Sequence, residues 1–90
     1  MKVLELSNGN LVAPESIRGV VKFAGKGVAI RNEFNKMLDF IKEPEAARQQ
    51  IIVDVLRGIL QQGRDWKQPD WAAELAKADK EAPQPAKKAA

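Results

Sequence analysis

The stretch "IIVDVLRGIL", Ile51–Leu60, decides the fold, because its apolar side chains recur with the period of an α-helix. At about 100° per residue, these apolar positions spread over roughly 180–200° of the helix surface. A helix that covers one face of a sheet needs an apolar stripe of only about 100° or somewhat more. The sequence therefore predicts a helix with a surplus apolar flank, centred on Val53, Leu56 and Leu60.

Both ends of this helix carry recognisable signals. Pro44 is well placed near a helix N-terminus, and Glu43 and Glu45 lie close to the positive end of the helix dipole. Gly63 follows the last apolar residues and is typical of a C-terminal cap. We therefore expect one long helix between residues 43 and 63.

Short apolar segments separated by turn residues precede the helix. Asn8 and Gly9 lie between "KVLEL" and "LVA", which predicts a hairpin whose two turn residues both have positive φ. Gly25 and Gly27 indicate a second turn, and Asn35 is a plausible left-handed residue in a third. The sequence therefore predicts an α+β fold, in which an antiparallel meander of four to five short strands packs against the long helix.

Side-chain alternation along the strands predicts which residues face the helix. The inward set is Ile17, Val21, Phe23, Val28, Ile30, Leu38 and Phe40. The outward set is Arg18, Val20, Lys22, Ala29, Arg31, Met37 and Ile41. Because both strand phenylalanines belong to the inward set, this assignment gives little support to base stacking on the outer side of the sheet.

Two tryptophans follow the helix, in a segment of mixed charge. Asp70 is a candidate N-cap for a short second helix that begins near Trp71. The last residues, "APQPAKKAA", contain no large apolar side chain, which predicts disorder. We expect a core domain over residues 1–63, a Trp-containing extension over 64–80 and a disordered tail over 81–90.

The composition argues against enzyme chemistry. The 90-residue chain contains neither cysteine nor histidine, which removes thiolate sites and the commonest general base. Ser7 and Ser16 have no histidine to activate them, and the Gly25–Gly27 turn lacks the spacing of a phosphate-binding loop. The sequence predicts no catalytic residue, no metal site and no cofactor.

The leading functional prediction is a small accessory protein, of the kind found among phage-type regulators, that binds another protein or a second copy of itself. The predicted partner-binding residues are Val53, Leu56, Leu60, Trp66 and Trp71. The alternative is that the tryptophan segment folds back and covers the surplus flank of the helix within the same chain.

The second functional prediction is nucleic-acid binding through a basic sheet face. Six basic residues against two acidic ones lie between Ile17 and Lys42, in a chain of formal net charge +3. The predicted binding residues are Arg18, Lys22, Lys26 and Arg31. No apolar run has the length of a signal sequence or a membrane span, so we expect a cytoplasmic protein.

Two general resemblances accompany this interpretation. The expected order of four short antiparallel strands and one C-terminal helix resembles transcriptional-coactivator and purine-rich-element single-strand binders, which implies dimerisation through helix and sheet surfaces. The stretch "LSNGNLVAPESI", Leu6–Ile17, is similar in pattern to short flagellar accessory proteins that begin with a Leu-x-Asn-Gly hairpin. We assign the chain to neither group and transfer no residue.

Overall fold

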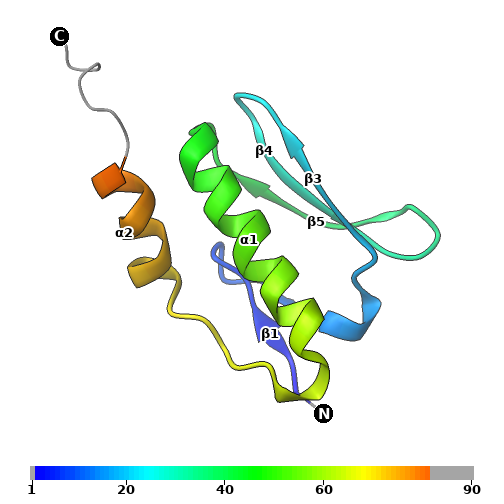
Figure 1. The fold of residues 1–90 in the computed structure, drawn as a ribbon. Helices are drawn as coiled ribbons and strands as arrows, with labels where there is room; N and C mark the ends of the chain where they lie inside the picture. Colours follow the sequence, from blue (N-terminus) through cyan, green and yellow to red (C-terminus); the bar gives the residue numbers. More distant parts are fainter. Residues whose placement is uncertain (1, 82–90) are drawn as a thin grey trace, which may run out of the picture.

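The computed structural model describes residues 2–81 and confirms the predicted α+β fold (Figure 1). The five short antiparallel strands form two sheets, with orders β1-β2 and β3-β4-β5. The elements are β1 (Leu4–Glu5), β2 (Leu11–Val12), a 3₁₀ turn (Pro14–Ser16), β3 (Gly19–Phe23), β4 (Gly27–Arg31), β5 (Met37–Lys42), α1 (Ala46–Gln62), a second 3₁₀ turn (Gly63–Asp65) and α2 (Trp71–Glu81). The tail predicted over residues 81–90 lies outside the described residues from residue 82 onward.

The predicted Asn-Gly hairpin joins β1 to β2, but its turn differs from the expected one. Gly9 has φ 90°, whereas Asn8 does not have a positive φ. The backbone N–H of Gly9 donates to the carbonyl oxygen of Leu6 over 2.9 Å, and the N–H of Leu6 donates to that of Asn10 over 2.8 Å. This is a three-residue loop whose last residue is left-handed, which needs only one positive φ.

The turn between β4 and β5 has the same construction. The N–H of Asn35 donates to the carbonyl oxygen of Asn32 over 2.9 Å, and the N–H of Asn32 donates to that of Lys36. Asn35 has φ 62°, which confirms the left-handed residue predicted there. The side chain of Asn32 also accepts hydrogen bonds from the N–H groups of Phe34 and Lys36.

The register of the three-stranded sheet corrects the predicted faces. Residues that are paired across an antiparallel ladder point to the same face. Val20 pairs with Ile30, and Val28 pairs with Ile41, so these four residues share the face that holds the buried core. Ile30, Val28 and Ile41 are buried, and Val20 is half-buried against the core. The prediction that Val20 and Ile41 point outward was therefore wrong.

The opposite face carries residues that were expected to point inward. Val21 and Phe40 both pair with Ala29, and Phe23 pairs with Gly27. Leu38 lies at an irregularity in β5 and is exposed. The prediction was therefore wrong for Val21, Phe23, Leu38 and Phe40. On β3, the physical reason is that Ile17 closes the 3₁₀ turn instead of starting the strand, so alternation counted from Ile17 is displaced by one residue. On β5, the polar residue Asp39 pairs with Ile30 on the inner face, where its carboxylate accepts hydrogen bonds from Asn8 and Asn10.

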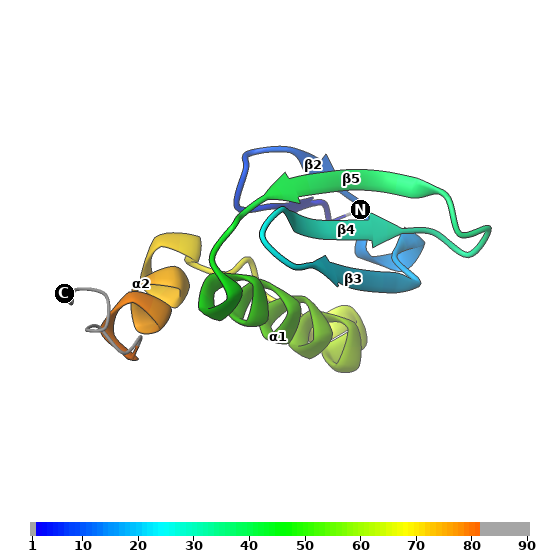
Figure 2. The same cartoon turned by 90° about the horizontal axis from the view of Figure 1, so that it is seen from above.

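Helix α1 lies across the inner face of this sheet, the face of Val20, Ile30 and Ile41 (Figures 1 and 2). Its last residue precedes Gly63, whose φ is 61°, which confirms the predicted C-terminal cap. Its N-cap, Glu45, makes no side-chain capping hydrogen bond. Helix α2 packs beside the beginning of α1, and Asp70 caps it, because its Oδ1 accepts from the N–H of Ala73 over 3.2 Å.

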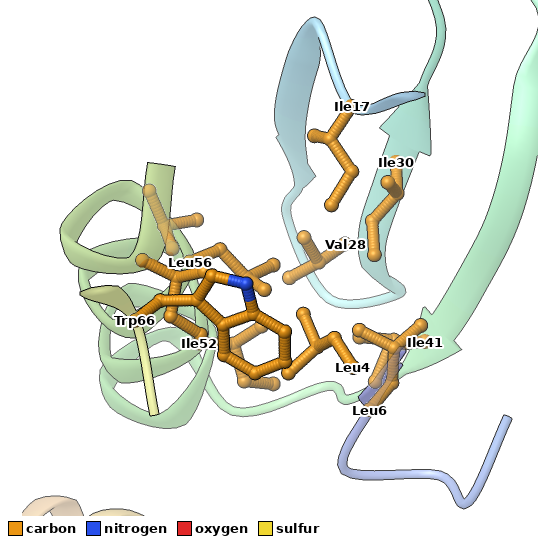
Figure 3. Close-up of a cluster of buried hydrophobic side chains, with 11 residues drawn as sticks. Leu4, Leu6, Ile17, Val28, Ile30, Ile41, Ile52, Leu56 and Trp66 are labelled. Carbon is orange, nitrogen blue, oxygen red and sulfur yellow. The ribbon is translucent and has the colours of Figure 1, made fainter. Parts of the chain in front are cut away.

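A continuous core lies between α1, the inner sheet face and the β1–β2 hairpin (Figure 3). Its buried members are Leu4, Leu6, Ile17, Val28, Ile30, Ile41, Ile52, Val53, Leu56, Ile59 and Trp66. Within residues 2–81, no helix has both the length and the apolar character needed to cross a membrane.

Candidate interaction surface

The surplus flank of α1 is largely covered by the chain itself. Leu56 is 0% exposed, and Val53 and Trp66 are also buried. Leu60 is 39% exposed, and Trp71 is half-buried against the core. Of the five residues predicted to bind a partner, three are therefore inaccessible in the folded chain, and only Leu60 and part of Trp71 remain at the surface.

The side chain of Trp66 covers part of the surplus apolar flank of α1. Its indole lies among Leu56, Ile52 and Leu4 in the close-up view (Figure 3). The Lys2 ammonium lies over the indole ring, 4.6 Å from its centre, and donates hydrogen bonds to the carbonyl oxygens of Arg64 and Trp66. Trp66 therefore folds back within the same chain, as the alternative prediction stated, and packs in the core with residues of the 1–63 segment.

The rest of the extension is fixed to β1 by hydrogen bonds. The side-chain amide of Gln68 accepts from the N–H of Glu5 and donates to its carbonyl oxygen, both over 2.9 Å. The indole N–H of Trp71 donates to the same carbonyl oxygen over 2.7 Å. Gln68 thus pairs with β1 in the way a neighbouring strand would, and the extension is an integral part of the fold.

The outer face of the β3–β5 sheet is the largest change from the sequence-based expectation. We define it by the side chains that the register places there: Val21, Phe23, Ala29, Arg31, Met37, Phe40 and Lys42. Val21 is 40% exposed and Phe23 is 37% exposed, while Phe40 is half-buried. The rings of Phe23 and Phe40 are in contact, with centroids 6.2 Å apart and planes tilted by 50°. Large apolar side chains therefore remain accessible to solvent on this face.

The charges on the outer face are all positive. Arg31 lies at one end of β4, and Lys42 pairs with Gly27 at the other end. Neither cation forms an ion pair within residues 2–81. The Arg31 guanidinium donates to the side-chain oxygen of Asn35 over 3.1 Å, and its buried Nε has no acceptor. Both cations are thus available to acidic groups of a binding partner.

The four residues of the predicted nucleic-acid face are not brought together on one face. Lys22 has the parity of the inner face and donates to the side chain of Gln50 on α1. Arg31 points to the outer face, and Lys26 lies in the turn between β3 and β4. Arg18 precedes β3 and donates to the carbonyl oxygens of Glu15 and Ile17 over 2.7 and 3.1 Å.

Sequence reasoning missed the structural role of Gln49, which is buried on the apolar side of α1. Its amide donates to the carbonyl oxygen of Phe23 over 3.0 Å and to that of Glu43 over 2.6 Å. These bonds fix the start of the helix to the end of β3. A polar residue among the apolar positions of the helix was the available signal, because buried polar groups are normally hydrogen-bonded.

The exposed outer face also had a signal in the sequence. Val28, Ala29 and Ile30 are consecutive apolar residues of β4, and all three are fully buried. A strand with one solvated face alternates between apolar and polar residues, whereas a strand between two apolar surfaces reads as a continuous apolar run. The run in β4 therefore indicated that both faces of the sheet are apolar.

Two ionisable groups with shifted pKa values, Asp39 and Arg48, make contacts that connect separate elements of the fold. Burial raises the pKa of Asp39, but hydrogen bonds from the side chains of Asn8 and Asn10 and from the N–H of Phe40 outweigh it, so the pKa lies below its ordinary value of 3.8. The pKa of Arg48 is raised because its guanidinium binds the carboxylates of Glu43 and Asp79, each at 2.9 Å. Asp39 thus ties the hairpin to β5, and Arg48 ties α2 to α1.

The described residues contain no convergent chemical site. Within residues 2–81, no group of three or more acidic side chains is arranged to hold a metal ion. A hollow of about 620 Å³ lies between α1, residues 65–70 and α2, and three of the four acidic side chains that line it have structural roles. Asp70 caps α2, Asp54 binds Gln50 and Arg57, and Glu74 binds Lys77.

Comparison of this chain with protein-family models, with curated proteins and with solved structures finds no match in any of the three.

Proposed function

We propose that this chain is a non-enzymatic binding module, and that the outer face of its β3–β5 sheet docks another protein. The single observation that carries the proposal is that Val21 and Phe23 are exposed beside Phe40 on the outer face of the sheet. Large apolar side chains that gather on an exposed surface are typical of interaction sites. The docking function predicted from the sequence is thereby moved from the flank of α1 to the outer sheet face.

The lack of a convergent site supports the non-enzymatic part of the proposal. The chain has no histidine or cysteine, and three of the four acidic side chains that line the hollow beside α2 are occupied by a cap or an ion pair. An acid–base or nucleophilic mechanism requires such groups to point together at a substrate.

The experiment combines photocrosslinking at two positions with substitutions of Val21 and Lys22, two adjacent residues of β3 that point to opposite faces. A photoreactive phenylalanine analogue is placed at position 23 on the outer face, or at the exposed position 61 on α1, in cells that encode the protein. We expect one discrete protein adduct from position 23 and none from position 61. Val21→Glu should abolish the adduct, because it places a charge in the apolar surface. Lys22→Glu, on the inner-face parity, should leave it intact.

Two results would contradict this proposal. One is adduct formation at position 23 that Val21→Glu does not reduce. The other is equal adduct formation at positions 23 and 61, which would indicate contact without a defined docking surface. Circular dichroism of Val21→Glu and Lys22→Glu provides the folding control, because both residues lie on the edge strand β3 and are exposed.

A second candidate function is single-stranded nucleic-acid binding on the same face. The observation that favours it is the outward position of Phe23 and Phe40, since exposed aromatic rings on a sheet can stack with bases. Arg31 and Lys42 on the face, with Lys26 in the adjacent turn, would contact phosphates. This function requires an affinity that falls steeply with salt, measured with a fluorescent oligonucleotide.

A further inference from the structure

We infer that the occupant of the outer face is an amphipathic helix of a different protein, whose apolar stripe carries an acidic residue at each end. This inference rests on the proposed docking function and names the chemistry of the partner. The outer face has an apolar centre, formed by Val21, Phe23 and Phe40, and a cation near each end, Arg31 and Lys42. None of the residues that the register places on this face is acidic.

The distribution of charge argues against a second copy of the same chain. Lys42 pairs with Gly27, which lies four residues before Arg31 on β4. At 3.3 Å per residue, the two cations are therefore about 13 Å apart along the strand direction. If two outer faces met, a cation of one copy would lie against a cation of the other, whether the strands ran parallel or antiparallel. Like charges brought together at an interface are strongly unfavourable.

The dimensions of the apolar centre fit a helix. Val21 on β3 and Phe40 on β5 flank Ala29 on β4, so the apolar surface is two inter-strand spacings wide, about 10 Å. A helix with its side chains has a diameter of about 10 Å. An extended peptide would instead pair with a sheet edge, because its affinity comes from backbone hydrogen bonds. On the inner face, α1 already shows that this sheet accepts a helix.

The geometry of the two phenylalanines favours apolar side chains over bases. Their rings touch at 6.2 Å and are tilted by 50°, so they form one continuous apolar ridge. Stacking of successive bases requires separate ring faces. The third apolar member, Val21, has no ring at all. A helical stripe with acidic residues about eight positions apart, at 1.5 Å per residue, would place a carboxylate near each cation.

The test is a selection with a defined library of displayed helical peptides. The apolar stripe of the library is fixed, and the two positions at its ends vary among Glu, Lys and Gln. Against the wild-type chain, we expect Glu to be enriched over Lys by about tenfold or more at both ends. Against Lys42→Glu, the preference should reverse at one end only, and against Arg31→Glu with Lys42→Glu it should reverse at both. Val21→Glu should abolish binding of the selected peptides, and Lys22→Glu should not.

The outcomes separate this inference from the proposed function. Selected peptides that require Val21 but show no charge preference would overturn the inference and leave the docking surface in place. If no selected peptide depended on Val21, both would fail. Dimerisation in sedimentation that Val21→Glu abolishes would overturn the inference in favour of a second copy. Binding of an oligothymidylate that Val21→Glu abolishes would overturn it in favour of nucleic acid.

Discussion

The ring of Phe40 on β5 lies so close to Gly27 on β4 that a Cβ atom on Gly27 would be 2.9 Å from the ring atoms Cε2 and Cζ. The same Cβ atom would overlap the carbonyl oxygen of Ile41. Gly27 pairs with Phe23, so the absence of a side chain at this position lets both aromatic rings gather on the outer face. The glycine is thus required for the construction of the candidate docking surface.

Gly27→Ala should destabilise the fold by about 1–3 kcal/mol or more, because backbone atoms must move to admit the methyl group. Gly19→Ala is the matched control on the neighbouring strand, since its nearest contact would be Arg31 Cβ at an ordinary 3.9 Å. We expect that change to alter the free energy of unfolding by no more than about 0.5 kcal/mol. Urea denaturation followed by circular dichroism measures both, and equal costs would refute the close packing at Gly27.

Two leucines on α1 test which part of the wide helical face is core. Leu56 is 0% exposed and Leu60 is 39% exposed. Leu56→Ala should cost about 2–5 kcal/mol. Leu60→Ala should cost about 1 kcal/mol or less, because less of its side chain is removed from water. Thermal and urea unfolding provide the comparison.

A charge at position 56 distinguishes a core residue from a partner contact. If Leu56 contacted a partner, Leu56→Asp would leave the monomer folded and abolish binding. Because Leu56 lies in the core of the chain, Leu56→Asp should instead yield an unfolded protein. A folded Leu56→Asp variant with a native circular dichroism spectrum would contradict the observed packing.

The elements that the sequence predicted correctly depend on local signals. The helix ends at Gly63, the left-handed residue is Asn35, and the cap of the second helix is Asp70. In each case, a residue type with a particular backbone or side-chain preference lies next to the feature that it determines. The hairpin at Gly9 was predicted for the same reason, although the prediction of a turn with two positive φ angles was wrong.

The faces of β4 were predicted correctly, but those of β3 could not be, because alternation along β3 was ambiguous. Val20 and Val21 are both apolar, so either of them could point to the core, and only the pairing of Val20 with Ile30 decides between them. The position of Trp66 was equally undetermined, since an apolar side chain near an apolar flank can cover it or meet a partner. Both questions depend on contacts between residues distant in sequence, which local patterns do not contain.

The two tryptophans should differ in their contribution to stability. Trp66→Ala removes a buried ring from the core and should cost about 3–5 kcal/mol. Trp71→Phe keeps a ring but loses the indole N–H that donates to the carbonyl oxygen of Glu5. That oxygen still accepts from Gln68, so we expect a cost of only about 0.5–1.5 kcal/mol. Circular dichroism in urea is the measurement, and a cost below about 1 kcal/mol for Trp66→Ala would show that the extension is not part of the core.

Asp39 should make stability depend on pH in the acid range. Although its burial acts in the opposite direction, hydrogen bonds from Asn8 and Asn10 place the pKa of Asp39 below its ordinary value of 3.8 in the folded chain. A lowered folded-state pKa stabilises the fold above the unfolded-state pKa, and this contribution is lost as the pH falls through the folded-state pKa. The wild-type free energy of unfolding should therefore decline below about pH 4, and Asp39→Asn should decline less over the same interval.

Asn10→Ala provides a more direct test of the cause of this shift. The Asn10 side-chain amide donates to both carboxylate oxygens of Asp39, over 3.2 and 3.0 Å, while Asn8 donates to one of them over 3.0 Å. Removal of the Asn10 amide should raise the pKa of Asp39, because the charged form loses two hydrogen bonds while its burial still disfavours charge. A carboxyl carbon titration by NMR measures the pKa in both proteins. An unchanged midpoint in Asn10→Ala would show that the Asn10 amide does not stabilise the Asp39 carboxylate.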